Sequence, residues 1–128
     1  MSADRHAHAV DDLVYMVTGV DENGDTHMDI HELDDAIAAD AFRRLVLHLR
    51  HRTDAQNIDL MGLAGFCRNC LADWLSEASA DGPTPISQDE GRALIHGMPF
   101  ADWKHRFQAP ATEEQLARMA SSVERNQF

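Results

Sequence analysis

The stretch DENGDTHMDIHE, Asp21 to Glu32, carries oxygen-bearing side chains at regular intervals. A twelve-residue calcium loop between two helices takes its ligands from positions 1, 3, 5, 7, 9 and 12, with a backbone carbonyl at position 7. Counted from the first aspartate, these positions hold Asp21, Asn23, Asp25, His27, Asp29 and Glu32. Calcium prefers many hard oxygen ligands, so the spacing predicts a calcium site in which the histidine gives its carbonyl and the other residues give side chains.

The residues on both sides of this loop have the apolar spacing of an entering and an exiting helix. The segment Val10–Ile37 therefore resembles the EF-hand family, which implies a helix–loop–helix that binds calcium. One departure is Thr26 at position 6, where glycine usually makes the sharp turn, and a β-branched residue there would weaken binding. The alternative interpretation is an acidic helix start with solvated carboxylates, because a helix dipole favours acids at that end.

A second group with chemical potential is the pair Cys67 and Cys70 in GFCRNCLADW. A Cys-x-x-Cys pair can be a redox dithiol, half of a metal site, or two small core residues. His48 and His51 on the preceding predicted helix form a His-x-x-His pair that would complete a zinc site. A thioredoxin-like dithiol requires a βαβ context, which the sequence does not show. All three interpretations remain open from spacing alone.

Other chemical signals in the sequence are weak. No triad order, phosphate-binding glycine loop or zinc-protease helix is present, so the sequence gives no support for an enzyme. The residues of GMPFADW are interpreted as packing residues, and the histidines that bracket it, His96 and His105, give no ligand set. A polar set around the cysteine segment predicts either a buried network or a ligand pocket, and comprises Asn57, Asp59, Arg68, Asn69 and Asp73.

The net charge of −11 is concentrated near the N-terminus. Residues 1–40 hold eleven Asp and Glu against one Arg, whereas residues 41–128 hold eleven against ten Lys and Arg. This balance argues against nucleic acid and anionic membranes as partners, because both require a basic surface. No apolar run could span a bilayer, and the stretch MSADRHAHAVDD lacks the basic start and apolar core expected of a signal peptide. Two cysteines are too few for a secreted disulfide framework. A cytoplasmic location is expected.

Apolar residues at helical spacing predict an all-α fold of five or six helices. The expected helices cover 10–20, 29–52, a long segment from Thr53 past Trp74, a short helix from Ser87 to Gly97, one from Pro99, and one from Thr112. Three pairs have the spacing of capping boxes, namely Thr53 with Gln56, Ser87 with Glu90, and Thr112 with Gln115. We expect an EF-hand-like extension over 1–37 and a helical domain over 38–128.

Two longer strings, NIDLMGLAGFCRNCLADW and EGRALIHGMPFADWKHRF, make the segment of about Ala36–Phe107 similar to the bacterial Domain of Unknown Function 1244 family. The resemblance implies a small helical protein and assigns no catalytic residues. The leading interpretation is a helical bacterial protein that binds one calcium ion. The alternatives are a thiol or zinc protein centred on Cys67 and Cys70, and a metal-free helical module that forms a homodimer.

Overall fold

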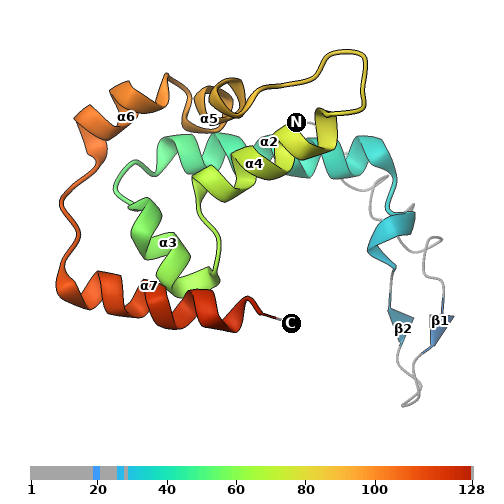
Figure 1. Ribbon diagram of the computed structural model, residues 1–128. Coiled ribbons are helices and arrows are strands. Elements are labelled where there is room, and N and C mark those ends of the chain that lie inside the picture. Colours follow the sequence, from blue (N-terminus) through green and yellow to red (C-terminus); the bar gives the residue numbers. More distant parts are fainter. Residues whose placement is uncertain (1–18, 21–25, 28, 128) are drawn as a thin grey trace. The chain divides into compact units, whose positions relative to one another are not determined.

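The computed structural model describes residues 19–20, 26–27 and 29–127, which fall into two compact units divided between residues 45 and 46. The predicted domain boundary after residue 37 stays a prediction, because this division lies inside a helix. The all-α prediction is confirmed, with six helices in the described residues (Figure 1). Their bounds are α2 Asp35–His51, α3 Asn57–Ala64, α4 Arg68–Ser79, α5 Gln88–His96, α6 Phe100–Phe107 and α7 Glu113–Arg125.

The first unit contains a short antiparallel pair, β1 Gly19–Val20 with β2 Thr26–His27, in which Val20 faces Thr26. The predicted entering helix, 10–20, lies outside the described residues except at its last two positions, which are extended. The prediction of helix at Gly19–Val20 is therefore wrong. The pairing to β2 uses the backbone groups that a helix would need for itself.

The predicted exiting helix from Asp29 to Arg52 is interrupted near its start. A 3-10 helix, η1 Ile30–Glu32, comes first, and the backbone then becomes extended at Leu33. The carboxylate of Asp34 accepts hydrogen bonds from the amides of Ala36 at 2.9 Å and Ile37 at 3.4 Å. Aspartate satisfies the free amides at a helix start in this way, so α2 begins afresh after Asp34.

The single long helix predicted through the cysteines is two helices, α3 and α4. Gly65 ends α3 with a φ of +76°, a left-handed conformation that glycine adopts without steric cost. Its carbonyl accepts a hydrogen bond from the side-chain amide of Asn126 at 2.9 Å. The predicted capping box at Thr53 is also wrong, because α3 begins later, after Gln56. The Gln56 side chain instead bonds the backbone of Phe107 and Ala109.

The other predicted helix ends are confirmed. Both side-chain-to-backbone hydrogen bonds of a capping box are present for Ser87 with Glu90 at α5 and for Thr112 with Gln115 at α7. Gly97 ends α5 with a φ of +81°. These signals lie within a few residues of one another, so local sequence determines them.

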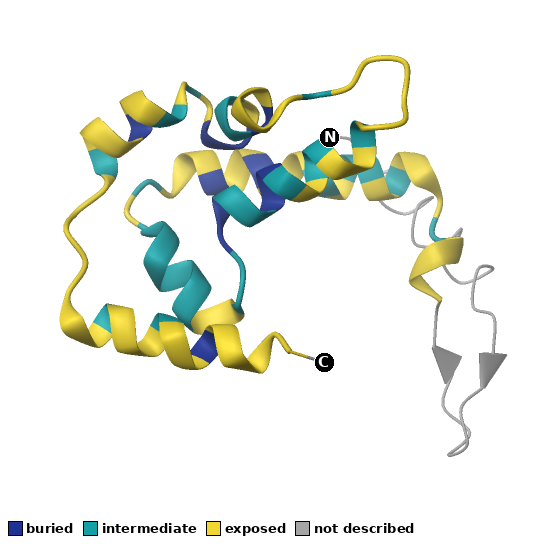
Figure 2. Cartoon of the chain, in the orientation of Figure 1, coloured by how far each residue is buried: buried dark blue, intermediate teal, exposed yellow. Residues whose placement is uncertain are grey.

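In the second unit, α3 packs against α7, α4 packs against α5, and α6 follows on α5 (Figure 1). The buried apolar residues lie on the last turns of α2, directly before and on α4, and on α5 and α6 (Figure 2): Val46, Leu49, Cys67, Leu71, Ala72, Ile95 and Trp103. The α4 and α5 backbones approach closely, since a Cβ on Gly91 would lie 3.0 Å from the carbonyl oxygen of Ala72. Within the described part of the chain, no helix has the length and apolar character needed to cross a bilayer.

Candidate functional site

Arg68 lies between the two cysteines in sequence, and its side chain is fully buried. One guanidinium nitrogen, Nη1, donates to the carbonyl of Ala55 at 2.7 Å and to Oδ1 of Asn57 at 3.1 Å. The other, Nη2, donates to the carbonyls of Leu49 at 3.0 Å and Arg52 at 2.7 Å. These acceptors belong to the end of α2, the following loop and the start of α3. A single side chain at the start of α4 therefore joins three segments.

The charge of Arg68 is balanced by carbonyl dipoles, since none of its hydrogen-bond partners in the described residues is a carboxylate. Carbonyls at a helix C-terminus carry partial negative charge, which suits a cation. The guanidinium carbon also lies 5.0 Å from the centre of the Trp103 ring, at cation–π distance. Burial lowers the pKa of Arg68, but an arginine keeps its proton at neutral pH.

His96 extends this network through Asn57. Its Nδ1 lies 2.7 Å from the carbonyl oxygen of Arg92, which can only accept, so Nδ1 carries the proton. Nε2 is then an acceptor, 3.4 Å from the Asn57 side-chain amide nitrogen. The imidazole packs against Phe100 and Trp103, with ring centres 4.8 and 5.0 Å away. Burial lowers the pKa of His96, so the ring is neutral at pH 7.

The structure divides the predicted polar set. Asn57 and Arg68 belong to the buried network, whereas Asp59 accepts from the Gln115 side chain at 2.9 Å and ties α3 to α7. Asn69 and Asp73 each keep one buried side-chain oxygen without a hydrogen-bond partner in the described residues.

Sequence analysis missed His96. The available signal was its place in the last turn of α5, directly before the helix-ending glycine.

The cysteines lie at the start of α4, with their Sγ atoms 3.9 Å apart and both thiols free. Cys67 precedes the helix with extended backbone and is buried, whereas Cys70 is half-buried in the first turn. Burial raises the pKa of the Cys67 thiol, while the nearby amides of Cys70 and Asn69 act in the opposite direction. The Cys67 thiol is therefore protonated at neutral pH.

The predicted zinc set is not brought together as a cluster. His48 and His51 are exposed on α2, whereas Cys67 is buried at the start of α4. Over residues 29–127 and the two short strands, no three His, Cys, Asp or Glu side chains are grouped closely enough to hold a metal ion. Zinc binding stays a prediction.

The predicted calcium ligands lie partly outside the described residues, namely Asp21, Asn23 and Asp25. His27 belongs to β2, Asp29 precedes η1, and Glu32 ends it. The Asp29 carboxylate accepts from the His31 amide at 2.9 Å. Both Asp29 and Glu32 are exposed, so their carboxylates are open to solvent and to a cation.

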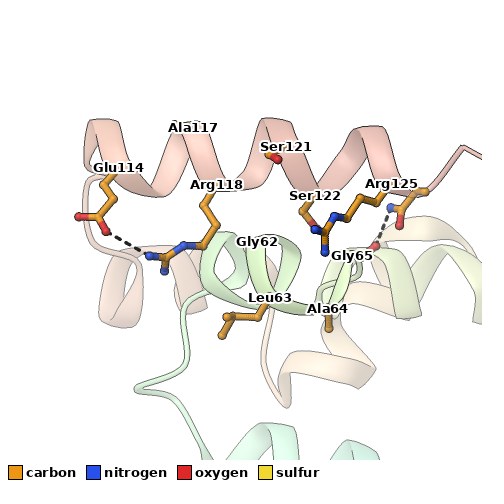
Figure 3. Close-up of a pocket in the computed structure, with 11 residues that line it drawn as sticks. Gly62, Leu63, Ala64, Gly65, Glu114, Ala117, Arg118, Ser121, Ser122 and Arg125 are labelled. Atoms are coloured by element: carbon orange, nitrogen blue, oxygen red, sulfur yellow. Dashed lines mark hydrogen bonds and ion pairs between the residues drawn. The ribbon is translucent and has the colours of Figure 1, made fainter.

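An open groove of about 680 Å³ lies between the end of α3 and α7. Arg118 and Arg125 reach from α7 toward the end of α3, and Leu63 and Gly65 line the other wall (Figure 3). Arg118 is paired with Glu114 at 3.1 Å. The groove lining contains no nucleophile with an adjacent base, so it has no recognisable catalytic arrangement.

Comparison with protein families gives one match, to the model described as "Protein of unknown function (DUF1244)", over residues 55–121. The match starts and ends later than the predicted segment, Ala36–Phe107. It includes the cysteine pair, Arg68 and His96. A comparison with curated proteins gave no match. Because the family model covers more than half of the 128 residues, this chain belongs to the DUF1244 family.

Proposed function

We propose that this DUF1244-family protein is a small bacterial cytoplasmic protein that binds one calcium ion through residues 21–32. The observation that carries the proposal is the complete set of oxygen donors at the six ligand positions of a calcium loop. The side-chain ligands would be Asp21, Asn23, Asp25, Asp29 and Glu32, with the carbonyl of His27.

The pairing of β1 with β2 supports this proposal. Val20 and Thr26, the two described residues that flank 21–25, are antiparallel partners, so their Cα atoms lie roughly 5 Å apart. Carboxylates gathered in so short a segment repel one another until a cation neutralises them. Calcium binding should therefore stabilise the N-terminal unit and leave the helices of the second unit unchanged.

The test is a calorimetric titration of the full chain, stripped of metal, with calcium in the presence of magnesium. We expect one site. Glu32→Gln should abolish it, because the last loop residue binds calcium through two oxygens. Glu22→Gln is the matched control, since it removes the same charge from a position that is not a ligand. Equal binding by both variants, or no binding up to about 1 mM calcium, would overturn the proposal.

A second candidate, association with another copy of this chain, is favoured by exposed apolar side chains in the second unit. Leu63 is 75% exposed, Leu47 61% and Trp74 53%. A small helical unit that leaves side chains of this size in water gains stability by covering them. Sedimentation over a range of concentrations should show a dimer, and Trp74→Gln should weaken it. A monomer at every concentration would refute this candidate.

A further inference from the structure

The two thiols at the start of α4 are in contact, and Cys70 is less deeply buried than Cys67. From this geometry we propose that Cys67 and Cys70 form a thiol–disulfide exchange site whose substrate is a small-molecule disulfide of the glutathione class. Calcium binding plays no part in this site.

The two sulfurs differ in access, and this difference sets the order of attack. Cys67, which directly precedes α4, is only 6% exposed, whereas Cys70 is half-buried. We therefore expect a small disulfide to reach the Cys70 sulfur more readily than that of Cys67. Thiol–disulfide exchange requires a thiolate to approach a sulfur atom directly, so access decides which thiol reacts first.

The first step joins Cys70 to half of the substrate. The Cys70 thiol loses its proton to solvent, its sulfur attacks one sulfur of the disulfide RSSR, and the other half leaves as RS⁻, which takes a proton to give RSH. In the second step, the protonated Cys67 thiol gives up its proton, and its sulfur attacks the Cys70 sulfur. The second half of the substrate leaves as RS⁻, which takes that proton to give RSH. The protein dithiol is oxidised by two electrons, and one RSSR is reduced to two RSH.

The fold holds the second sulfur in place for that step. The Sγ atoms are already 3.9 Å apart, and a disulfide requires about 2.05 Å. Because Cys67 precedes the helix in an extended conformation, its side chain can turn without breaking a helical turn. Arg68 anchors this corner through its backbone amide, 3.3 Å from Asn57 Oδ1, and through its guanidinium. Because the fold holds the two sulfurs together, the attack of Cys67 on the mixed disulfide is an intramolecular step. The mixed disulfide should therefore not accumulate.

In the experiment, the full chain is reduced and then incubated with oxidised glutathione at neutral pH. Samples are quenched with acid, and their mass is measured by mass spectrometry. Wild type should lose the mass of two hydrogen atoms. Cys67→Ser should stop as the mixed disulfide with glutathione on Cys70. Cys70→Ser should react only after denaturation, because its remaining sulfur is buried. Circular dichroism of each variant confirms that its helices are formed.

Two results would overturn the proposal. One is a wild-type protein that keeps both thiols under conditions in which the denatured chain is oxidised. The other is a wild-type protein that accumulates the mixed disulfide as Cys67→Ser does. If Cys67→Ser fails to fold, peptide mapping of the transient wild-type adduct gives the same information. An adduct on Cys67 instead of Cys70 would contradict the order of attack.

Discussion

Replacement of Arg68 by methionine removes the side chain that joins α2, α3 and α4, while keeping a long apolar stem in the core. The four carbonyl-type acceptors of Arg68 would each lose a donor, one in a buried and three in a part-buried setting. Methionine cannot donate a hydrogen bond, and water cannot replace the guanidinium without opening the packing against Trp103. The free energy of unfolding should therefore fall.

The size of this fall follows from two opposed contributions. Hydrogen bonds from a charged donor contribute about 1.5–3 kcal/mol each, so the four bonds amount to roughly 6 kcal/mol at the lower limit. Burial of a cation without a carboxylate partner costs several kcal/mol, and methionine removes that cost. The net loss should be about 2–4 kcal/mol. For a unit of this size the Tm should drop by roughly 10–30 °C.

The assay is urea unfolding of the full chain followed by circular dichroism. Arg118→Met is the matched control, because Arg118 is exposed and its ion pair with Glu114 should contribute about 1 kcal/mol or less. If both variants lose the same small amount, the carbonyl bonds of Arg68 only offset the cost of burying its charge. The stabilising role of this arginine would then be refuted.

Two further predictions concern the C-terminal end of α5. Burial lowers the pKa of His96, so the imidazole binds a proton more readily in the unfolded chain than in the folded one. The free energy of unfolding should therefore be retained above about pH 6.5 and fall below it, by at most about 1.4 kcal/mol per pH unit. Urea unfolding against pH should show this slope reduced in His96→Gln and retained in His105→Gln, whose ring is exposed. Gly97→Ala should cost about 1–2 kcal/mol, since φ is +81° and a Cβ would lie 3.0 Å from an arginine side chain. Gly82→Ala, with an ordinary contact at 3.4 Å, should change stability by less than about 0.5 kcal/mol, and equal losses would contradict the argument.

The accuracy of the predicted helices depended on whether the determining contacts are local. The starts of α5 and α7 were predicted because each box closes within four residues. The end of α3 was missed, because the apolar spacing continues past Gly65 and the stop is stabilised by Asn126, directly after α7 and 61 residues away. A glycine in an apolar helical pattern does not by itself distinguish a tolerated residue from a helix end.

The same reasoning explains how far the candidate site could be predicted. Asn57 and Arg68 are close enough in sequence to be recognised as one polar set. His96 was missed because it meets Asn57 from 39 residues away, and its place before the helix-ending glycine does not by itself show that the ring is buried. Spacing alone could not decide between burial and exposure for the cysteines, since that depends on how α4 packs.

The close approach of α4 and α5 limits which substitutions can be accepted at the contact between them. The atom that blocks a Cβ at Gly91 is the carbonyl oxygen of Ala72, which every amino acid carries. No substitution at position 72 can therefore compensate for a larger residue at position 91, and pairwise covariation between the two positions should be absent. A larger residue at position 91 would require the α4 and α5 backbones to move apart at this contact. A mutational scan of the whole chain should lose nearly every variant at Gly91, while the smaller Ala72→Gly variant survives.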